Sequence, residues 1–289
     1  MLWWGVIDPR LLVLALVLAE SCYWVFTRAL LPYLPPASSG FWMIGLAVLE
    51  LYVFARGRIQ WQVFRRHLWF FVTIGLLVGV NTNMGFVAAR YVEPGTASLL
   101  SRTSIIFGVA LGVLWLGERL TKMQTAGAVI AIAGTIVVAL QPGDHLRAGS
   151  LIVVVATLLY ALHSAVVKRF GGQMPFLEFF FFRLAATGTV LLLLGVAQGE
   201  LVWPGATAWV ILFLAATVNV VLSRGLYYLA LRRLDMTVLT IALTLSPVVT
   251  WLWAIPLFGG RPTLAEIAGG VAILAGVIVV NASGGLTKR

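Results

Sequence analysis

Charged side chains are scarce in this sequence. Asp, Glu, Lys and Arg make up only 10% of its 289 residues, whereas hydrophobic residues make up 61%, and the mean hydropathy is +1.01. A water-soluble domain of this size could not cover so much apolar side chain with so few charges. The composition therefore excludes a soluble protein and indicates a chain that folds in lipid.

The residues that most metal and cofactor sites require are also few. Cys22 is the single cysteine and there are three histidines, which excludes an intrachain disulfide and a thiolate metal cluster. Neither the H-E-x-x-H pattern of a metalloprotease nor the G-x-x-x-x-G-K phosphate loop occurs. We therefore expect no metal, no cofactor and no catalytic residue, and neither an enzyme nor an ATP-driven pump.

Long apolar runs, separated by short polar or Pro/Gly breaks, fill the rest of the chain. A membrane-spanning helix needs roughly 20 mostly apolar residues. The runs predict an all-α polytopic membrane protein with ten transmembrane helices, at residues 11–31, 39–56, 68–90, 94–116, 122–140, 149–169, 176–198, 206–231, 235–258 and 263–282. The breaks at 91–93 and 232–234 leave no room for an extramembrane domain, so function is expected among the helices.

The formal net charge of +10 has a topological explanation. Of the 20 Lys and Arg, thirteen fall on the side of the N-terminus, four on the opposite side and three within the predicted helices. The positive-inside rule therefore predicts cytoplasmic N- and C-termini, and we expect an integral protein of the bacterial inner (cytoplasmic) membrane. With the charge so explained, the expected partner is the lipid bilayer and not a nucleic acid.

An internal repeat becomes visible when the sequence is shifted by 142 residues. Eleven of the 22 positions from 117 to 138 are then identical to those from 259 to 280, among them Gly127 with Gly269 and Gly134 with Gly276. Apolar helices match by chance on Val, Ile and Ala, so the evidence for a duplication comes from the shared Gly, Arg and Thr. The repeat predicts two five-helix units, at 1–142 and 143–289.

The two units are expected to have opposite orientations in the membrane, because an odd number of spans separates equivalent positions. The break after the second span contains four arginines, whereas the corresponding break after the seventh contains no Lys or Arg. Inverted repeats around a site in the middle of the membrane are typical of secondary transporters. The alternative is that the duplication only builds a scaffold.

Several stretches resemble the EamA-type transporters of the drug/metabolite transporter superfamily. Leu116-Gly117-Glu118-Arg119-Leu120-Thr121, with Gln124, Gly127 and Gly134, is similar to the signature between the fourth and fifth helices of that family, and the lead-in from Ala88 to Leu100 is similar too. The second half echoes these in Ala230-Leu231-Arg232-Arg233 and Ser246-Pro247, and Phe182-Arg183 resembles a pair in the seventh helix.

The chain departs from the family pattern at three places. Ile105 stands opposite Pro247 in the repeat, Gly260 stands opposite Glu118, and Glu20 occupies a position where the family more often has an aromatic residue. The resemblance implies ten helices, cytoplasmic termini and a central cavity lined mainly by helices 1, 3, 4, 6, 8 and 9. It also implies export or import of amino acids, sugars or related metabolites.

Polar side chains deep in the predicted spans form the candidate site, because such groups are costly in lipid and usually face a cavity. The candidates for substrate binding or cavity lining are Glu20, Trp24, Asn81, Ser98, Arg102, Tyr160, His163, Ser164, Asn219, Arg224, Tyr227, Thr240, Thr244 and Pro247. Glycines expected to allow close helix packing are Gly75, Gly79, Gly127, Gly134, Gly269 and Gly276.

Glu20 and His163 are the candidates for coupling to protons. Glu20 could equally bind a substrate ammonium group or form a permanent salt bridge with Arg102, and His163 could equally be a hydrogen-bonded core residue. Arg102 could hold a substrate carboxylate through its fork of donors. Asn83 shares a face with Gly75 and Gly79 and is expected to bond another helix.

For Pro247, Arg183, Glu50 and Glu178 the sequence also predicts structural roles. Pro247 frees a backbone carbonyl and marks either a hinge or a tolerated kink. Arg183 is expected to be a structural anchor, and Glu50 and Glu178 boundary or ion-pair residues.

The leading hypothesis is a secondary transporter, with export favoured, that moves a small metabolite such as an amino acid by alternating access to a central cavity. The alternative is a non-transporting scaffold or lipid-handling protein with the same fold, in which the buried charges pair with one another. Substrate identity, coupling to protons, and a monomeric or homodimeric state stay open.

The inverted topology makes a direct prediction about two loops. Tags placed at residues 60 and 203 should be reached from opposite faces of the membrane in intact cells, because an odd number of spans lies between them. Accessibility labelling that placed both on one face would contradict the inverted repeat.

Overall fold

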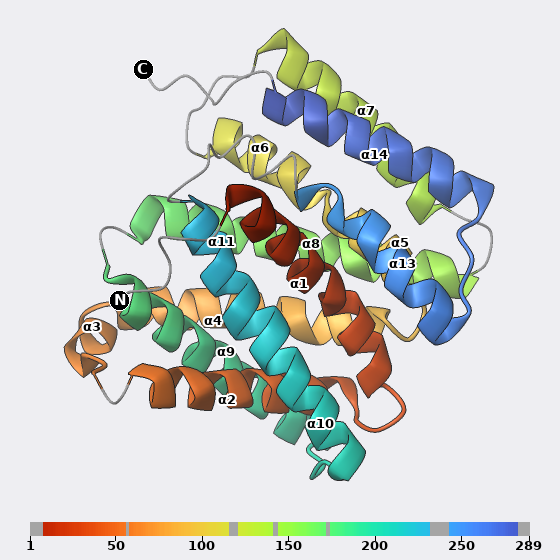
Figure 1. Ribbon diagram of the computed structural model, residues 1–289. Helices are drawn as coiled ribbons and strands as arrows, with labels where there is room; N and C mark the ends of the chain where they lie inside the picture. The colour runs from red at the N-terminus through yellow and green to blue at the C-terminus, as the bar shows by residue number, and fades with distance from the viewer. Residues whose placement is uncertain are drawn as a thin grey trace.

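Helices form all of the regular structure in the part of the chain that the computed structural model describes, residues 8–55, 58–115, 121–140, 144–171, 174–231 and 243–282. The helices are α1 (Pro9–Leu30), α2 (Pro36–Ala55), α3 (Trp61–Arg66), α4 (Leu68–Ala88), α5 (Pro94–Ser101), α6 (Ser104–Leu114), α7 (Lys122–Ala139), α8 (Asp144–Phe170), α9 (Phe176–Gln198), α10 (Ala206–Ala215), η1 (Ala216–Leu222), α11 (Ser223–Leu231), α13 (Ser246–Phe258) and α14 (Leu264–Ala282). Figure 1 shows them as one bundle.

Eight stretches of the described residues are helical, long and apolar enough to cross a membrane. They are Arg10–Leu30, Pro36–Ala55, Leu68–Ala88, Pro94–Leu114, Lys122–Ala139, Ala148–Phe170, Phe176–Gln198 and Ala206–Tyr227. Two shorter apolar helices, Ser246–Phe258 and Leu264–Val280, follow them. Each of the ten predicted spans therefore overlaps an apolar helix, although the ninth, 235–258, begins among residues that lie outside the described ones.

A helix that the sequence analysis did not anticipate lies in the break after α2. Trp61 of this short α3 packs against Phe182 of α9, with ring centroids 5.4 Å apart. The same aromatic region includes Phe70 and Phe71, which are fully buried where α4 meets α9. Gly75 and Gly79 continue this contact, since a methyl group at either position would lie 2.8 Å from Cβ of Ala186 or of Val190.

α7 and α14 pack against each other along their length at one edge of the bundle (Figure 1). Glycines allow the close approach: a methyl group at Gly127 would lie 2.7 Å from the carbonyl oxygen of Gly276, and one at Gly134 would lie 2.6 Å from that of Gly269. Both neighbours are backbone atoms, which cannot move aside. The two helices run antiparallel, because the lower-numbered glycine of one meets the higher-numbered glycine of the other.

This contact has the form of a two-fold axis. Gly127 and Gly269 are equivalent in the repeat, as are Gly134 and Gly276. Gly127 contacts Gly276, which is the equivalent of Gly134, and Gly134 contacts Gly269, which is the equivalent of Gly127. A contact in which position i meets j and j meets i is the mark of two-fold related surfaces. The fifth helix of each predicted unit therefore packs on its own counterpart.

The starts of α7 and α14 are built alike. Thr121 and Gln124 form a reciprocal capping box. The backbone N–H of Gln124 donates to Thr121 Oγ1 at 3.2 Å, and the backbone N–H of Thr121 donates to the side-chain Oε1 of Gln124 at 2.9 Å. Thr263 and Glu266 make the same two bonds at 3.1 and 2.8 Å. The threonine shared by the repeats thus satisfies backbone amides that would otherwise lack partners at a helix start.

Both halves contain a helix break at the same place. α5 ends at Ser101 and α6 begins at Ser104, whereas α13 begins at Ser246 after a turn at Thr244 and Leu245. In the first half, the hydroxyls of Ser101 and Thr103 donate hydrogen bonds to the carbonyl oxygens of Ala97 and Leu100, at 2.8 and 2.7 Å respectively. Such bonds from side chain to backbone compete with continuation of the helix. In the second half, a proline in the first turn of α13 lacks the amide that a continuous helix needs.

The glycine contact between α7 and α14 predicts a large effect of a single methyl group. Gly134→Ala should destabilise the protein by about 1–3 kcal/mol, because the added carbon meets backbone of α14. Gly45→Ala is the matched control: it has open space around the new methyl and should be neutral or stabilising by about 0.5–1 kcal/mol. Thermal unfolding in detergent measures both, and equal melting temperatures would contradict the close contact.

Candidate functional site

A cavity of about 220 Å³ lies in the middle of the bundle. Residues of α1, α2, α4, α5, α6, α8, α9, η1 and α11 line it, together with Arg102 at the α5–α6 break. Sites for drug-sized ligands occupy roughly 300–1,000 Å³. This cavity is smaller and suits a single small molecule.

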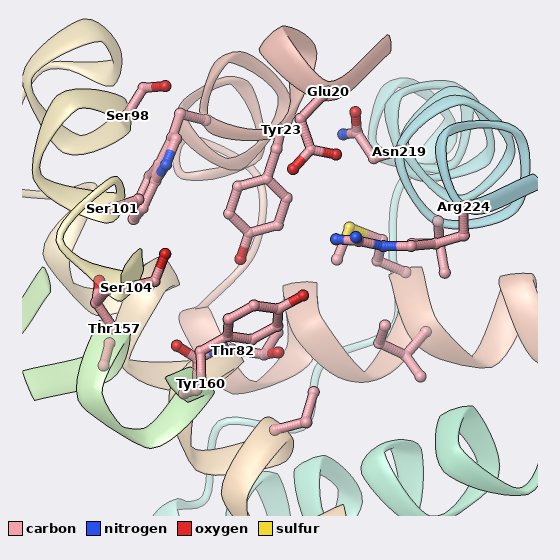
Figure 2. A pocket seen from close by; sticks show the side chains of 18 of the residues that line it. Glu20, Tyr23, Thr82, Ser98, Ser101, Ser104, Thr157, Tyr160, Asn219 and Arg224 are labelled. Atoms are coloured by element: carbon pink, nitrogen blue, oxygen red, sulfur yellow. The ribbon is translucent and has the colours of Figure 1, made fainter. Parts of the chain in front are cut away.

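Eight of the sequence-predicted residues are brought together in this lining: Glu20, Trp24, Asn81, Ser98, Arg102, Tyr160, Asn219 and Arg224. They come from α1, α4, α5, the α5–α6 break, α8, η1 and α11, and therefore from both repeats. Figure 2 shows how Glu20, Asn219 and Arg224 lie on one side of the cavity, across from Ser98, Ser101 and Ser104.

Three predicted residues on α8 and α11 lie outside the lining. His163 is buried behind Tyr160, with the two rings 5.5 Å apart, and neither of its nitrogens has a hydrogen-bond partner among the described residues. Ser164 is exposed and donates to its own helix at Tyr160 O. Tyr227 lies about one turn beyond Arg224 and packs against the apolar cluster that contains Leu12 and Leu16.

Two predicted residues of the ninth span also lie outside the lining. Thr244 and Pro247 are buried at the helix break. Their neighbours Ser246 and Thr250 bond two residues that do line the cavity, Arg102 and Ser98. Thr240 lies outside the described residues. Asn83, expected to bond another helix, is also outside the lining, and its Oδ1 has no partner among the described residues.

Sequence reasoning missed several lining residues. Tyr23, Thr82, Ser101 and Ser104 were not singled out, and Arg183 was expected to be only an anchor. α2 and α9, which the family resemblance did not emphasise, add the apolar residues Met43, Ile44, Phe180 and Leu184. The in-span charge of Arg183 was a usable signal; the apolar residues carried none, because every side of these helices is apolar.

Glu20 lies half-buried near the middle of its span and accepts a hydrogen bond from Ser223 at 2.8 Å. Its carboxylate interacts electrostatically with Arg224 and Arg102. In Figure 2 both the carboxylate of Glu20 and the guanidinium of Arg224 point into the cavity. One wall of the cavity therefore presents an acceptor and a strong donor side by side.

Arg102 connects the two halves at their helix breaks. Its Nη2 donates to Ser246 Oγ, and its buried Nε has no partner among the described residues. Glu20 and Arg102 each form a hydrogen bond with a serine, and their charges also interact electrostatically. The polar break of the first half is thereby tied to the first residue of α13 in the second.

Asn219 stands out among the polar residues of the lining. It is 6% exposed, and neither its Oδ1 nor its Nδ2 has a partner among the described residues. It lies within η1, a stretch of π-helix whose wider turn interrupts the span between α10 and α11. Such wide turns occur frequently at functional sites.

Metal ligands are not gathered here: among the described residues, no group of three or more His, Cys, Asp or Glu could hold a metal ion. The lining instead offers hydroxyls, two amides, three guanidiniums and one carboxylate. These groups bind small polar or charged organic molecules by hydrogen bonds.

The bond between Arg102 and Ser246 predicts energetic coupling between the halves. Ser246→Ala should destabilise the protein by about 1.5–3 kcal/mol, because it leaves a buried charged donor without its acceptor. The same change should cost much less in an Arg102→Met background, as a double-mutant cycle of melting temperatures would show. Ser164→Ala, at an exposed site, serves as the neutral control; strictly additive effects of the pair would count against the coupling.

Known proteins resemble this chain along both of its halves. The EamA-like transporter family matches residues 9–140 and again residues 147–282. A protein of Streptantibioticus cattleyicolor named "Probable terminal-alkyne amino-acid exporter" is 30% identical over 196 residues, 66% of this chain and 65% of that protein. The chain thus spans slightly less than two thirds of that relative's length.

Two further comparisons extend over more of the chain. A "Probable amino-acid metabolite efflux pump" of Salmonella typhimurium is 26% identical over 242 residues, which cover 75% of this chain and 79% of the relative. A protein of known crystal structure has the same fold, with a TM-score of 0.67 over 94% of this chain and 96% of its own, at 20% identity. With both repeats matched, this chain is an integral membrane protein and belongs to the EamA-like transporter family.

Proposed function

We propose that this protein is a secondary transporter that exports a small metabolite such as an amino acid by alternating access to the central cavity. The observation that carries the proposal is the cavity itself, in which charged and polar side chains from both repeats converge deep within the predicted spans. Charges are expensive at this depth and persist where they serve a pathway. A small polar or charged substrate would satisfy them.

The arrangement of the repeats supports a mechanism of this kind. α7 and α14 pack antiparallel about a two-fold contact, as expected for ten helices in two units of opposite orientation. Two such units can exchange their conformations, so that the cavity opens first to one side and then to the other. We place the protein in a bacterial inner membrane, with both termini in the cytoplasm as the charge distribution predicts.

Two observations support an amino acid as substrate. Both relatives described above carry amino acids in their names, one as an exporter and one as an efflux pump. The cavity holds an acceptor and donors of opposite charge within a volume of about 220 Å³, which suits one small zwitterion. The driving force in this proposal is the substrate's own gradient or a proton gradient, and no cofactor is required.

The alternative of a non-transporting scaffold requires the buried charges to pair with one another. Glu20, Glu50 and Arg102 form hydrogen bonds with hydroxyl groups, those of Ser223, Thr217 and Ser246 respectively, and Glu20 also interacts electrostatically with Arg102 and Arg224. A scaffold would not require the cavity that these groups line. The cavity therefore favours transport over a purely structural role.

Water and solutes that reach the cavity should make Ser104 chemically accessible. Ser104 lines the cavity at the start of α6, so Ser104→Cys, in a chain with Cys22→Ala, should react with a small charged thiol reagent. In proteoliposomes containing radiolabelled amino acids, flux by the wild-type chain should exceed that of empty vesicles. Flux by the labelled variant should fall to the level of empty vesicles.

Val129→Cys in the same background is the matched control, because Val129 is 60% exposed on α7, away from the cavity. Reagent treatment should leave its flux unchanged. Absence of flux for every amino acid and related metabolite in the panel, with the wild-type protein folded, would contradict the proposed function.

A further inference from the structure

A second hollow, of about 550 Å³, lies at the end of the bundle where α1 and α4 end. Arg28, Leu31 and Arg90 of the first repeat line it, together with Ile211 of α10 and Phe258 of α13 from the second. α1 and α13 lie side by side there (Figure 1). This hollow, which we call the arginine groove, shares no lining residue with the central cavity.

Two positive charges meet in the arginine groove. Arg28 lies in the last turn of α1, and Arg90 follows the end of α4. Nη1 of Arg28 donates to the backbone oxygen of Ala89, the residue just before Arg90. Among the described residues that line the groove, none is acidic. Two guanidinium groups in one groove repel each other, so an anion between them would stabilise both.

Both arginines have donors to offer such an anion. An arginine side chain carries five N–H donors, and Arg28 uses one of them on Ala89, which also fixes the guanidinium at the end of α4. Arg90 is exposed, and its side chain makes no hydrogen bond or ion pair with another described residue. The groove therefore presents one guanidinium that is held in place and one that is free to close on a ligand.

The remaining walls of the arginine groove are largely apolar. Leu31, Ile211 and Phe258 are each partly exposed, and Tyr33, at the rim, is 50% exposed. A small inorganic anion gains nothing from such walls. A molecule that joins an anionic group to a hydrocarbon chain gains from both parts of the groove, because burying the chain against these side chains is favourable.

The arginine groove lies at the depth of lipid head groups. Arg28 is close to the end of the apolar span Arg10–Leu30, and Arg90 lies just beyond the end of Leu68–Ala88. The polar head groups of a bilayer begin where its hydrocarbon core ends. By the predicted topology, only four of the 20 Lys and Arg fall on this face of the membrane. Two of those four meet in one groove, so the positive charge of this face is concentrated there.

We propose that the arginine groove binds an anionic phospholipid, with the phosphodiester between Arg28 and Arg90 and an acyl chain along Ile211 and Phe258. A guanidinium group matches the geometry of a phosphate through two parallel N–H bonds. Phosphatidylethanolamine carries an ammonium group as well, for which no described residue of the groove offers a carboxylate. Phosphatidylglycerol has no such cation, so the groove selects lipids by the net charge of the head group.

The test is a lipid-binding measurement on the purified full-length protein, delipidated in a neutral detergent. Phosphatidylglycerol and phosphatidylethanolamine with the same acyl chains are titrated, and native mass spectrometry counts the bound lipids. An arginine near an anionic head group strengthens binding about fivefold. We therefore expect the first phosphatidylglycerol to bind at least about fivefold more tightly than phosphatidylethanolamine.

Variants of Arg90 assign the binding to the groove. Arg90 is exposed, so its replacement should leave the fold intact, as the melting temperature will show. Arg90→Gln should weaken the binding of the first phosphatidylglycerol about fivefold and leave that of phosphatidylethanolamine unchanged. Arg90→Glu, which adds a repulsive charge, should weaken it about 25-fold.

Two exposed arginines outside the groove provide matched controls. Arg261 belongs to the same predicted face of the membrane, and Arg65 lies on α3 at the opposite, predicted cytoplasmic face. Arg261→Gln and Arg65→Gln should each bind the first phosphatidylglycerol as the wild type does. Arg65 matters because most of the Lys and Arg are predicted to be cytoplasmic, and that face is the competing place for an anionic lipid.

Several results would overturn the assignment. Phosphatidylethanolamine could bind as tightly as phosphatidylglycerol, or folded Arg90 variants could bind phosphatidylglycerol normally. A loss in Arg65→Gln and not in Arg90→Gln would place the lipid on the cytoplasmic face. Inorganic phosphate is the probe for a free anion: if it raised the melting temperature of the wild type as much as phosphatidylglycerol does, and not that of Arg90→Gln, the groove would be an anion site and not a lipid site.

Discussion

Within a lipid bilayer, every polar group must find its hydrogen-bond partner inside the protein. This constraint accounts for the helical structure of the described chain and for the behaviour of many hydroxyl side chains. Thr27, Thr157 and Thr187 each donate to a carbonyl of their own helix, at 2.8, 2.7 and 2.8 Å. Arg102 and Asn219 keep buried polar atoms that have no hydrogen-bond partner among the described residues, and both line the central cavity, where another molecule can supply one.

The same constraint shapes the contact between the two halves. Lipid tails are as apolar as leucine, so helices gain little by hiding apolar surface from lipid, and close packing must hold them together. α7 and α14 achieve it with four glycines, which bring backbone against backbone along a two-fold contact. This pair contributes no residue to the cavity, and its close packing suits a part of the molecule that stays together while other helices move.

The cavity is less symmetric than the surrounding helices. The helix breaks of the two halves occupy equivalent positions, yet Arg102 lines the cavity while its counterpart Thr244 is buried away from it. Glu20 and Arg102 come from the first half, and Asn219 and Arg224 from the second. A duplicated scaffold therefore carries a site with distinct groups in its two halves.

The sequence by itself determined the lipid environment, the positions of the apolar helices, and the repeat, in which threonines at helix starts and glycines within helices recur at equivalent positions. These depend on composition and on local rules: apolar length for a span, and a threonine three residues before Gln124 or Glu266 for a helix start. Intramembrane charge also pointed to Glu20, Arg102 and Arg224, because the cost of burying a charge in lipid does not depend on the details of the fold.

Only the tertiary structure decided which face of each helix meets the cavity. In a soluble protein the apolar face of a helix indicates its buried side, but in a membrane protein both sides are apolar. Met43 and Phe180 therefore looked no different from residues in contact with lipid, and Ser164 and Tyr160 looked alike although only Tyr160 lines the cavity. The unpartnered amide of Asn219 likewise depends on the wide turn of η1 and on the neighbouring helices, which no local sequence rule specifies.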